Sequence, residues 1–124
     1  MLRILALILM GCATTADVAT VEAELLKNVE EIRQTQLALL VLGEFTPCGD
    51  ESSAQKNAST TARTWKGERC WSEVGWKPDQ DVYGGYWVTV ANDDFVVHGI
   101  GPKIGTNPRL HIIATKREKA HPKP

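Results

Sequence analysis

Three cysteines stand in different sequence contexts, and each context suggests a different chemistry for its thiol. Cys12 follows a short apolar run at the start of the chain, where a thiol can accept a lipid. Cys48 lies between Pro47 and Gly49, and Cys70 precedes a tryptophan. Thiols far from the N-terminus can pair with each other or bind a metal, so the cysteines have to be interpreted together.

Residues 1–11 have the composition of a secretory leader. Arg3 supplies a positive charge, and residues 4–10 form a short apolar stretch. Leu9-Met10-Gly11-Cys12 resembles the lipobox of bacterial lipoproteins, in which a small residue precedes the modified cysteine. The resemblance implies a signal peptide over 1–11, acylation of Cys12 and a lipidated linker over 12–17. Acyl chains anchor stably, since each buried methylene contributes about 0.8 kcal/mol.

This leader has three other interpretations. Residues 4–10 could be the first turn of a buried helix, with Cys12 as a packed thiol, or the true start codon could lie upstream. Gly11 could instead precede a prepilin cleavage site. That class has Glu at the fifth mature position, where this chain has Ala16, and a long apolar helix after it. We therefore expect a lipoprotein leader.

Cys48 and Cys70 remain as a pair once Cys12 carries lipid. Export places a chain in an oxidising compartment, where two thiols in a small domain most often form a disulfide. Closing a loop of roughly 20 residues would stabilise the fold by about 3 kcal/mol. Metal binding is the alternative, but there is no Cys-x-x-Cys spacing and no nearby histidine. We expect a Cys48–Cys70 disulfide, no metal site and no cofactor.

Tryptophans are the candidate binding residues. Exposed indole rings can serve as stacking platforms, so Trp65, Trp71 and Trp76 are candidates for contacting a glycan or another small ligand. The alternative, which we favour, is that the three rings pack in the core or at a sheet edge.

The histidines and aspartates do not form a recognisable catalytic set. His98 and His111 could face each other across neighbouring strands, with Asp93 or Asp94 nearby. Nothing in the sequence unites a nucleophile, a base and an oxyanion donor, so an enzyme is not expected. The aspartates also lack the ligand spacing of a calcium loop, and turns explain them more simply.

Length and charge exclude several classes of protein. A chain of 124 residues holds one domain at most, with a modest core. A formal net charge of −1 is too low for electrostatic binding of nucleic acid. No stretch reaches the roughly 18 apolar residues of a membrane span, so membrane attachment is expected through acyl chains alone.

Residues 18–43 are expected to form one long helix, because apolar residues recur at steps of three and four. The stripe consists of Val18, Val21, Leu25, Val29, Ile32 and Leu39 or Leu40. Asp17 can cap the N-terminus and Gly43 can end the helix. Residues 37–42 are apolar nearly all round. We expect this end to be the more deeply buried, while the N-terminal half projects toward the membrane.

The second half of the chain predicts an antiparallel sheet within 82–115. The expected elements are a strand over 83–91, a turn at 92–94 and strands over 95–100 and 110–115. The fold class is therefore α+β, with the long helix packed on a sheet of three or four antiparallel strands.

Two segments are expected to lie outside this layer. Residues 44–66 are rich in Ser, Thr, Asn, Asp and Gly, which predicts a long surface loop, followed by one helical turn at 70–74. Residues 116–124 are charged and contain proline, which predicts a flexible tail.

The chain also resembles type IV pilin-like proteins from about residue 23 to residue 115. The segments that carry the resemblance are NVEEIRQTQLA at 28–38, WSEVGWKPD at 71–79 and the strand segments at 86–90, 95–97 and 113–115. The resemblance implies the pilin globular domain over 18–115. The apolar half-helix that pilins use for filament packing is missing, and the loop at 101–108 lacks the acidic metal-binding pattern of some relatives.

Together these features lead us to expect a lipid-anchored protein of a bacterial cell envelope with a non-catalytic interaction domain. Ala13 is not an acidic retention signal, which favours the outer membrane, facing the periplasm or the surface. Expected partners are the membrane and envelope or pilus proteins, as for an accessory component of a type IV pilus or secretion system. A lipoprotein that binds glycans or small ligands through its tryptophans is the alternative.

Overall fold

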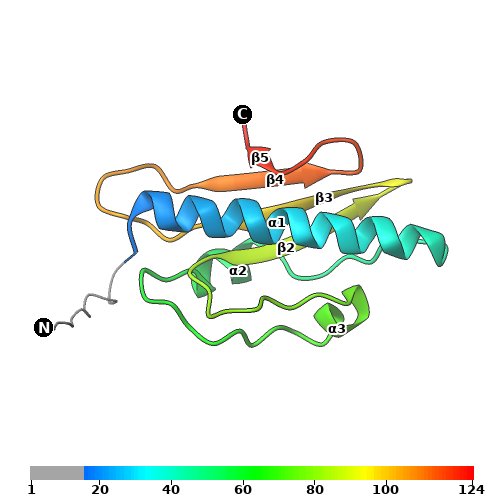
Figure 1. Cartoon of the computed structure of the whole chain (residues 1–124), viewed down its shortest axis with the longest axis horizontal. Helices are drawn as coiled ribbons and strands as arrows, with labels where there is room; N and C mark the ends of the chain where they lie inside the picture. The colour runs from blue at the N-terminus through cyan, green and yellow to red at the C-terminus, as the bar shows by residue number, and fades with distance from the viewer. Residues whose placement is uncertain (1–15) are drawn as a thin grey trace, which may run out of the picture.

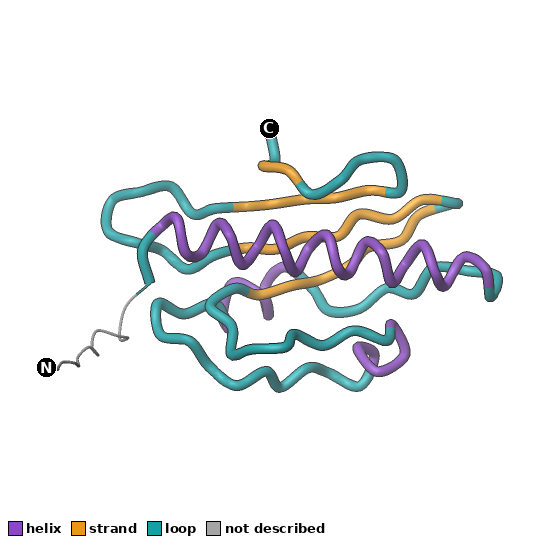
Figure 2. The backbone as a smooth tube through the Cα atoms, in the orientation of Figure 1, coloured by secondary structure: helices purple, strands orange, loops and turns teal. Residues whose placement is uncertain are grey.

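A computed structural model describes residues 16–124 and confirms the α+β fold class. The long helix α1 (Val18–Val41) lies along one face of a four-stranded sheet (Figure 1). The strands follow one another in sequence order, each antiparallel to the next: β2 (Gly85–Ala91), β3 (Asp94–Ile100), β4 (His111–Thr115) and β5 (His121–Pro122). Short helices α2 (Glu51–Asn57) and α3 (Cys70–Val74) lie in the connection between α1 and β2 (Figure 2).

The ends of α1 follow from local capping. The Asp17 carboxylate accepts a hydrogen bond from the Thr20 amide at 2.8 Å, as predicted for an N-cap. At the other end Gly43 has a φ of 122°, which residues with a side chain rarely adopt. The helix therefore ends at Val41, close to the expected position.

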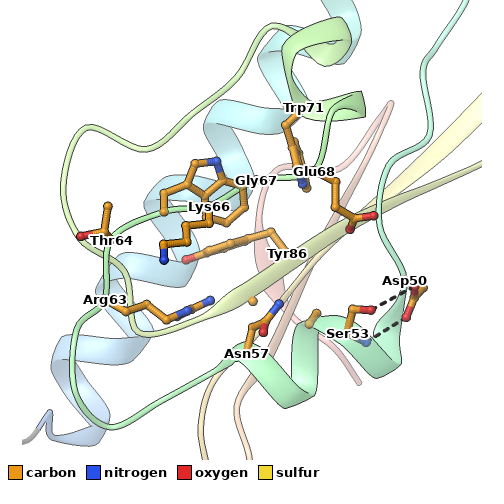
Figure 3. A pocket seen from close by; sticks show the side chains of 13 residues that line it. Asp50, Ser53, Asn57, Arg63, Thr64, Lys66, Gly67, Glu68, Trp71 and Tyr86 are labelled. Atoms are coloured by element: carbon orange, nitrogen blue, oxygen red, sulfur yellow. Dashed lines mark hydrogen bonds between the residues drawn. The ribbon is translucent and has the colours of Figure 1, made fainter.

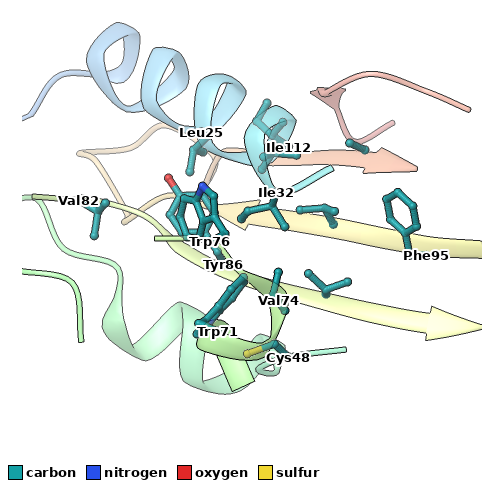
Figure 4. Close-up of a cluster of buried hydrophobic side chains, with 14 of the residues drawn as sticks. Leu25, Ile32, Cys48, Trp71, Val74, Trp76, Val82, Tyr86, Phe95 and Ile112 are labelled. Atoms are coloured by element: carbon teal, nitrogen blue, oxygen red, sulfur yellow. The ribbon is translucent and has the colours of Figure 1, made fainter. Parts of the chain in front are cut away.

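The apolar stripe of α1 lies directly on the sheet. Val21, Leu25, Val29 and Ile32 are fully buried in the core that α1 shares with the strands. Figure 4 shows Leu25 and Ile32 in this core. Two glycines, Gly84 just before β2 and Gly99 in β3, make this close approach possible: a Cβ added at Gly84 would lie 2.5 Å from Leu25 Cδ2. One at Gly99 would lie 2.6 Å from Val29 Cγ2. The sheet surface thus has a shallow channel for the helix ridge.

The expectation about which end of α1 is buried is wrong. The buried residues of α1 run from Val21 to Gln36, whereas Leu40, Val41 and Leu42 at its C-terminal end are 43%, 86% and 83% exposed. A helix of 24 residues is about 36 Å long, and a strand of seven residues spans only about 23 Å. Because α1 is longer than the sheet beneath it, its C-terminal end extends past the strands (Figure 1).

The prediction of a continuous surface loop over residues 44–66 is wrong, because these residues contain α2. The Asp50 carboxylate accepts from the Ser53 amide at 2.8 Å and starts this helix. Ala54 then packs with Trp87 and Ile100 on the outer face of the sheet. The polar composition of the segment concealed a helix whose single buried residue is an alanine.

The prediction of a flexible tail over residues 116–124 is also wrong, because this segment contains β5. β5 pairs with β4, and charged side chains of α1 hold the turn between these strands. Arg33 donates to the carbonyls of Thr115 at 2.7 Å and Lys116 at 3.1 Å. Glu30 accepts from the Ala120 amide at 3.0 Å. These partners lie far away in sequence, so local composition could not reveal them.

The structure confirms the Cys48–Cys70 disulfide. Cys48 also exchanges two backbone hydrogen bonds with Val88, at 3.1 and 2.8 Å, so it lies against the free edge of β2. Cys70 is the first residue of α3. The bond therefore ties α3, and the core residues that it carries, to the edge of the sheet. Among the described residues no helix is both long and apolar enough to cross a bilayer.

Replacing Gly99 tests the close approach of helix and sheet. The methyl of Gly99→Ala would meet Val29 Cγ2 at 2.6 Å and Tyr86 Cε1 at 3.0 Å, so we expect a loss of about 1–3 kcal/mol in the free energy of unfolding. Urea denaturation measures the loss. In the Val29→Ala background the same substitution should cost clearly less, because the space is then vacant. Strict additivity of the two losses would contradict this packing.

Candidate functional site

The three tryptophans proposed as ligand contacts do come together. Trp65, from the segment after α2, packs edge to face with Trp71 and Trp76, with ring centroids 5.5 and 5.3 Å away. Trp71 and Trp76 are only 4% and 6% exposed, so neither offers an open ring face. The core interpretation therefore describes these two, and only Trp65 is half-buried.

The indole N–H groups differ in a way that the sequence does not show. Trp76 donates from Nε1 to the Glu31 carboxylate at 3.1 Å, which fixes it to α1. Trp71 is as deeply buried, yet its Nε1 has no hydrogen-bond partner among residues 16–124 and retains some solvent contact. Figure 3 shows the nitrogen end of Trp71 directed into a cavity.

This cavity, which we call the Trp65 cavity, lies between α2, residues 63–68 and β2. It has a volume of about 400 Å³, within the range of about 300–1,000 Å³ usual for small-ligand pockets. Ala54, Gly85 and Tyr86 contribute to its floor. Its other lining residues are Asp50, Ser53, Asn57, Arg63, Thr64, Trp65, Lys66, Gly67, Glu68 and Trp71.

Charges of opposite sign line the two sides of the Trp65 cavity. Arg63 and Lys66 lie on one side, and Asp50 and Glu68 on the other (Figure 3). The Arg63 guanidinium is positioned by the carbonyls of Val82 and Gly84, at 3.0 and 2.9 Å. Burial lowers the pKa of Arg63, and the nearby Glu24 carboxylate opposes that shift. Such an arrangement suits a ligand with an anionic group at one end and neutral hydroxyls at the other.

A buried network holds the floor of the cavity in place. The Tyr86 hydroxyl donates to Glu24 at 2.6 Å and accepts from Asn28 at 3.1 Å. The same Glu24 carboxylate accepts from the amides of Tyr83 and Gly84, at 2.7 and 2.9 Å. Burial and the Glu24 charge raise the pKa of Tyr86 well above its ordinary value. The phenol therefore stays protonated and serves as a fixed structural group.

His98 and His111 face each other, as predicted, on the outer face of the sheet. His98 Nδ1 lies 3.0 Å from His111 Nε2, and the Trp87 ring stacks on His98 with centroids 4.3 Å apart. The aspartates suggested as neighbours lie elsewhere: Asp94 accepts from the amides of Phe95 and Lys116. In the described part of the chain no three His, Cys, Asp or Glu side chains converge as a metal site would require.

A second surface stands out at the end of α1. We call Leu40, Val41 and Leu42 the apolar tip, since these are large apolar side chains in contact with solvent. Below the tip, Phe45 is buried against Phe95 with ring centroids 4.8 Å apart. The sequence signal for this surface is the apolar run just before Gly43, which predicts burial, whereas the structure exposes it. Cys12, the predicted lipidation site, lies outside the described residues.

Compared with known proteins, the chain matches no protein-family model, no curated protein and no solved structure.

The histidine pair predicts a pH dependence of stability. Burial lowers the pKa of His98 from 6.5 to about 4, with smaller contributions from the charges of His111 and Lys123. Burial also lowers the pKa of His111. As the pH falls from 6.5 to about 4, the unfolded chain takes up protons that the folded chain does not. This contribution to stability is therefore present above pH 6.5 and is lost toward pH 4. Urea denaturation across this range should show the loss.

The variant His98→Phe keeps a ring stacked on Trp87 but removes one titrating group. We expect its free energy of unfolding to fall less steeply over the same pH range. An unchanged slope would show that the pair does not cause the pH dependence.

Proposed function

We propose that this chain is a lipid-anchored protein of a bacterial cell envelope whose folded domain acts by binding another protein at the apolar tip of α1. The observation that carries the proposal is the exposure of Val41 and Leu42, at 86% and 83%, beside Leu40. Val41 and Leu42 would each gain about 1.5–3 kcal/mol from full burial, so a partner that covered the tip would be stabilised there.

The direction of α1 agrees with this arrangement. The helix begins just after the proposed lipidated linker and runs about 36 Å before it reaches the tip. An anchor at Cys12 and a partner at Leu42 would therefore lie at opposite ends of one rigid element. The Cys48–Cys70 disulfide is consistent with an oxidising compartment outside the cytoplasm.

The order of elements supports a narrower version of the proposal. A long helix followed by an antiparallel meander is the order expected from the resemblance to type IV pilin-like proteins. We propose a role as an accessory component of a pilus or secretion system, held in place by lipid and recognising another envelope protein.

Acyl labelling tests the anchor. Cells given a radiolabelled or clickable fatty acid should label the wild-type protein, and the Cys12→Ala variant should lose the label and leave the membrane fraction. Cys48→Ala/Cys70→Ala should retain the label, which separates lipidation from the effects of losing the disulfide. An unlabelled wild-type protein would rule out the lipid anchor.

Site-specific photo-crosslinking tests the apolar tip. A photoreactive amino acid at Val41 should give a discrete crosslinked product in intact cells, whereas the same group at Ala23, exposed on the N-terminal half of α1, should not. Val41→Gln/Leu42→Gln should abolish the product formed from Leu40 while changing the free energy of unfolding by no more than about 0.5 kcal/mol, since both side chains are exposed. Equal products from both positions would contradict a specific surface.

A further inference from the structure

We propose that the Trp65 cavity binds a carboxylated sugar, such as a uronic acid unit of a polysaccharide. This inference is independent of the proposed partner at the apolar tip. The cavity and the tip are formed by different elements, so either could fail without the other.

The unpartnered N–H of Trp71 points to a ligand. A buried donor normally finds an acceptor, because leaving it without one costs free energy. Trp71 is 4% exposed, and its Nε1, which retains some solvent contact, meets no acceptor among the described residues, so its acceptor has to come from the cavity as water or ligand. Its N–H faces the cavity (Figure 3). A hydroxyl or ring oxygen of a sugar would supply the acceptor.

The Trp65 ring offers a rigid wall of the kind on which sugar rings stack. It packs against Trp71, Trp76 and Tyr86, with centroids 5.3–6.2 Å apart. The backbone at Gly67 lies against its nitrogen edge, where an added Cβ would be only 2.5 Å from Nε1. The ring is therefore held in position before a ligand arrives, so little conformational entropy would be lost on binding.

The two basic side chains on one side of the cavity would bind the carboxylate of the proposed sugar. Arg63 is positioned by two backbone carbonyls, and the exposed Lys66 makes no hydrogen bond to another described residue. Together they offer charge-assisted hydrogen bonds to one anionic group. Asn57 lines the same cavity and can both donate to and accept from hydroxyls.

The acidic side of the cavity limits the total charge of the ligand. The Asp50 carboxylate is occupied by the amide and hydroxyl of Ser53, at 2.8 and 3.3 Å, whereas Glu68 is exposed and can accept from sugar hydroxyls. A nucleotide, which concentrates several negative charges in its phosphates, would be repelled there. A uronic acid sugar, with one carboxylate per ring and uncharged hydroxyls around it, matches both sides.

Calorimetric titration of the purified full chain in detergent tests the proposal. Digalacturonate is the probe, neutral galactobiose matches it in size, and the dipeptide Ala-Ala supplies a carboxylate without a sugar ring. We expect digalacturonate to bind at least about tenfold more tightly than galactobiose, because only the acid gains charge-assisted hydrogen bonds. Ala-Ala should bind still more weakly. Equal affinity for the acid and the neutral sugar, preference for Ala-Ala, or no binding of digalacturonate would each overturn the proposal.

Variants locate the binding site. Lys66→Gln should weaken digalacturonate binding about tenfold without affecting folding, since the side chain is exposed. Lys103→Gln, also exposed, should leave the affinity unchanged. Trp71→Phe removes the N–H and keeps an aromatic ring, and it should lose affinity, whereas Trp76→Phe should not. If Trp71→Phe fails to fold, the comparison of Lys66→Gln with Lys103→Gln still tests whether the ligand binds in the Trp65 cavity. Equal affinity of these two variants for digalacturonate would place the ligand elsewhere.

Discussion

The fold depends on α1 making two kinds of contact at once. Its apolar ridge packs on the sheet, and polar side chains on either side of the ridge bond backbone groups of other segments. Buried Gln36 exchanges hydrogen bonds of 2.7 and 2.9 Å with the backbone of Thr46. Glu24 binds the chain entering β2, and Arg33 the turn after β4. Since buried backbone groups need partners, these bonds select one position of the helix along the sheet.

Periodicity predicted the fold class, α1 and most of the sheet because those features arise from neighbours in sequence. Asp17 and Gly43 marked the helix ends, and alternation placed β2 and β3 within a few residues. Periodicity indicates which side of a helix is apolar but not how far the sheet extends beneath it, so the exposed end of α1 was missed. β5 was missed for a related reason, because its turn depends on Glu30 and Arg33.

The candidate sites were harder to predict than the fold. Residue type identified Trp65, Trp71 and Trp76, but only packing shows that Trp76 donates to Glu31 and that Trp71 meets no acceptor within residues 16–124. The sequence does not identify Arg63 and Lys66 as candidate binding residues, because isolated basic residues are common on protein surfaces. The histidine pair was foreseen, since His98 and His111 lie on the same face of neighbouring strands. Asp94 is not a neighbour of the pair, because its side chain accepts from the amides of Phe95 and Lys116, and the sequence does not reveal these bonds.

The Cys48–Cys70 bond closes a ring of chain, and that ring supplies the walls of the Trp65 cavity except for Trp71, Gly85 and Tyr86. Cleavage of one peptide bond inside the ring would leave both pieces covalently attached. Within the ring, α2 packs on the outer face of the sheet, opposite α1, so substitutions on the exposed side of α2 need not disturb the helix on the sheet. Evolution could therefore alter what the cavity recognises while the scaffold beneath stays the same.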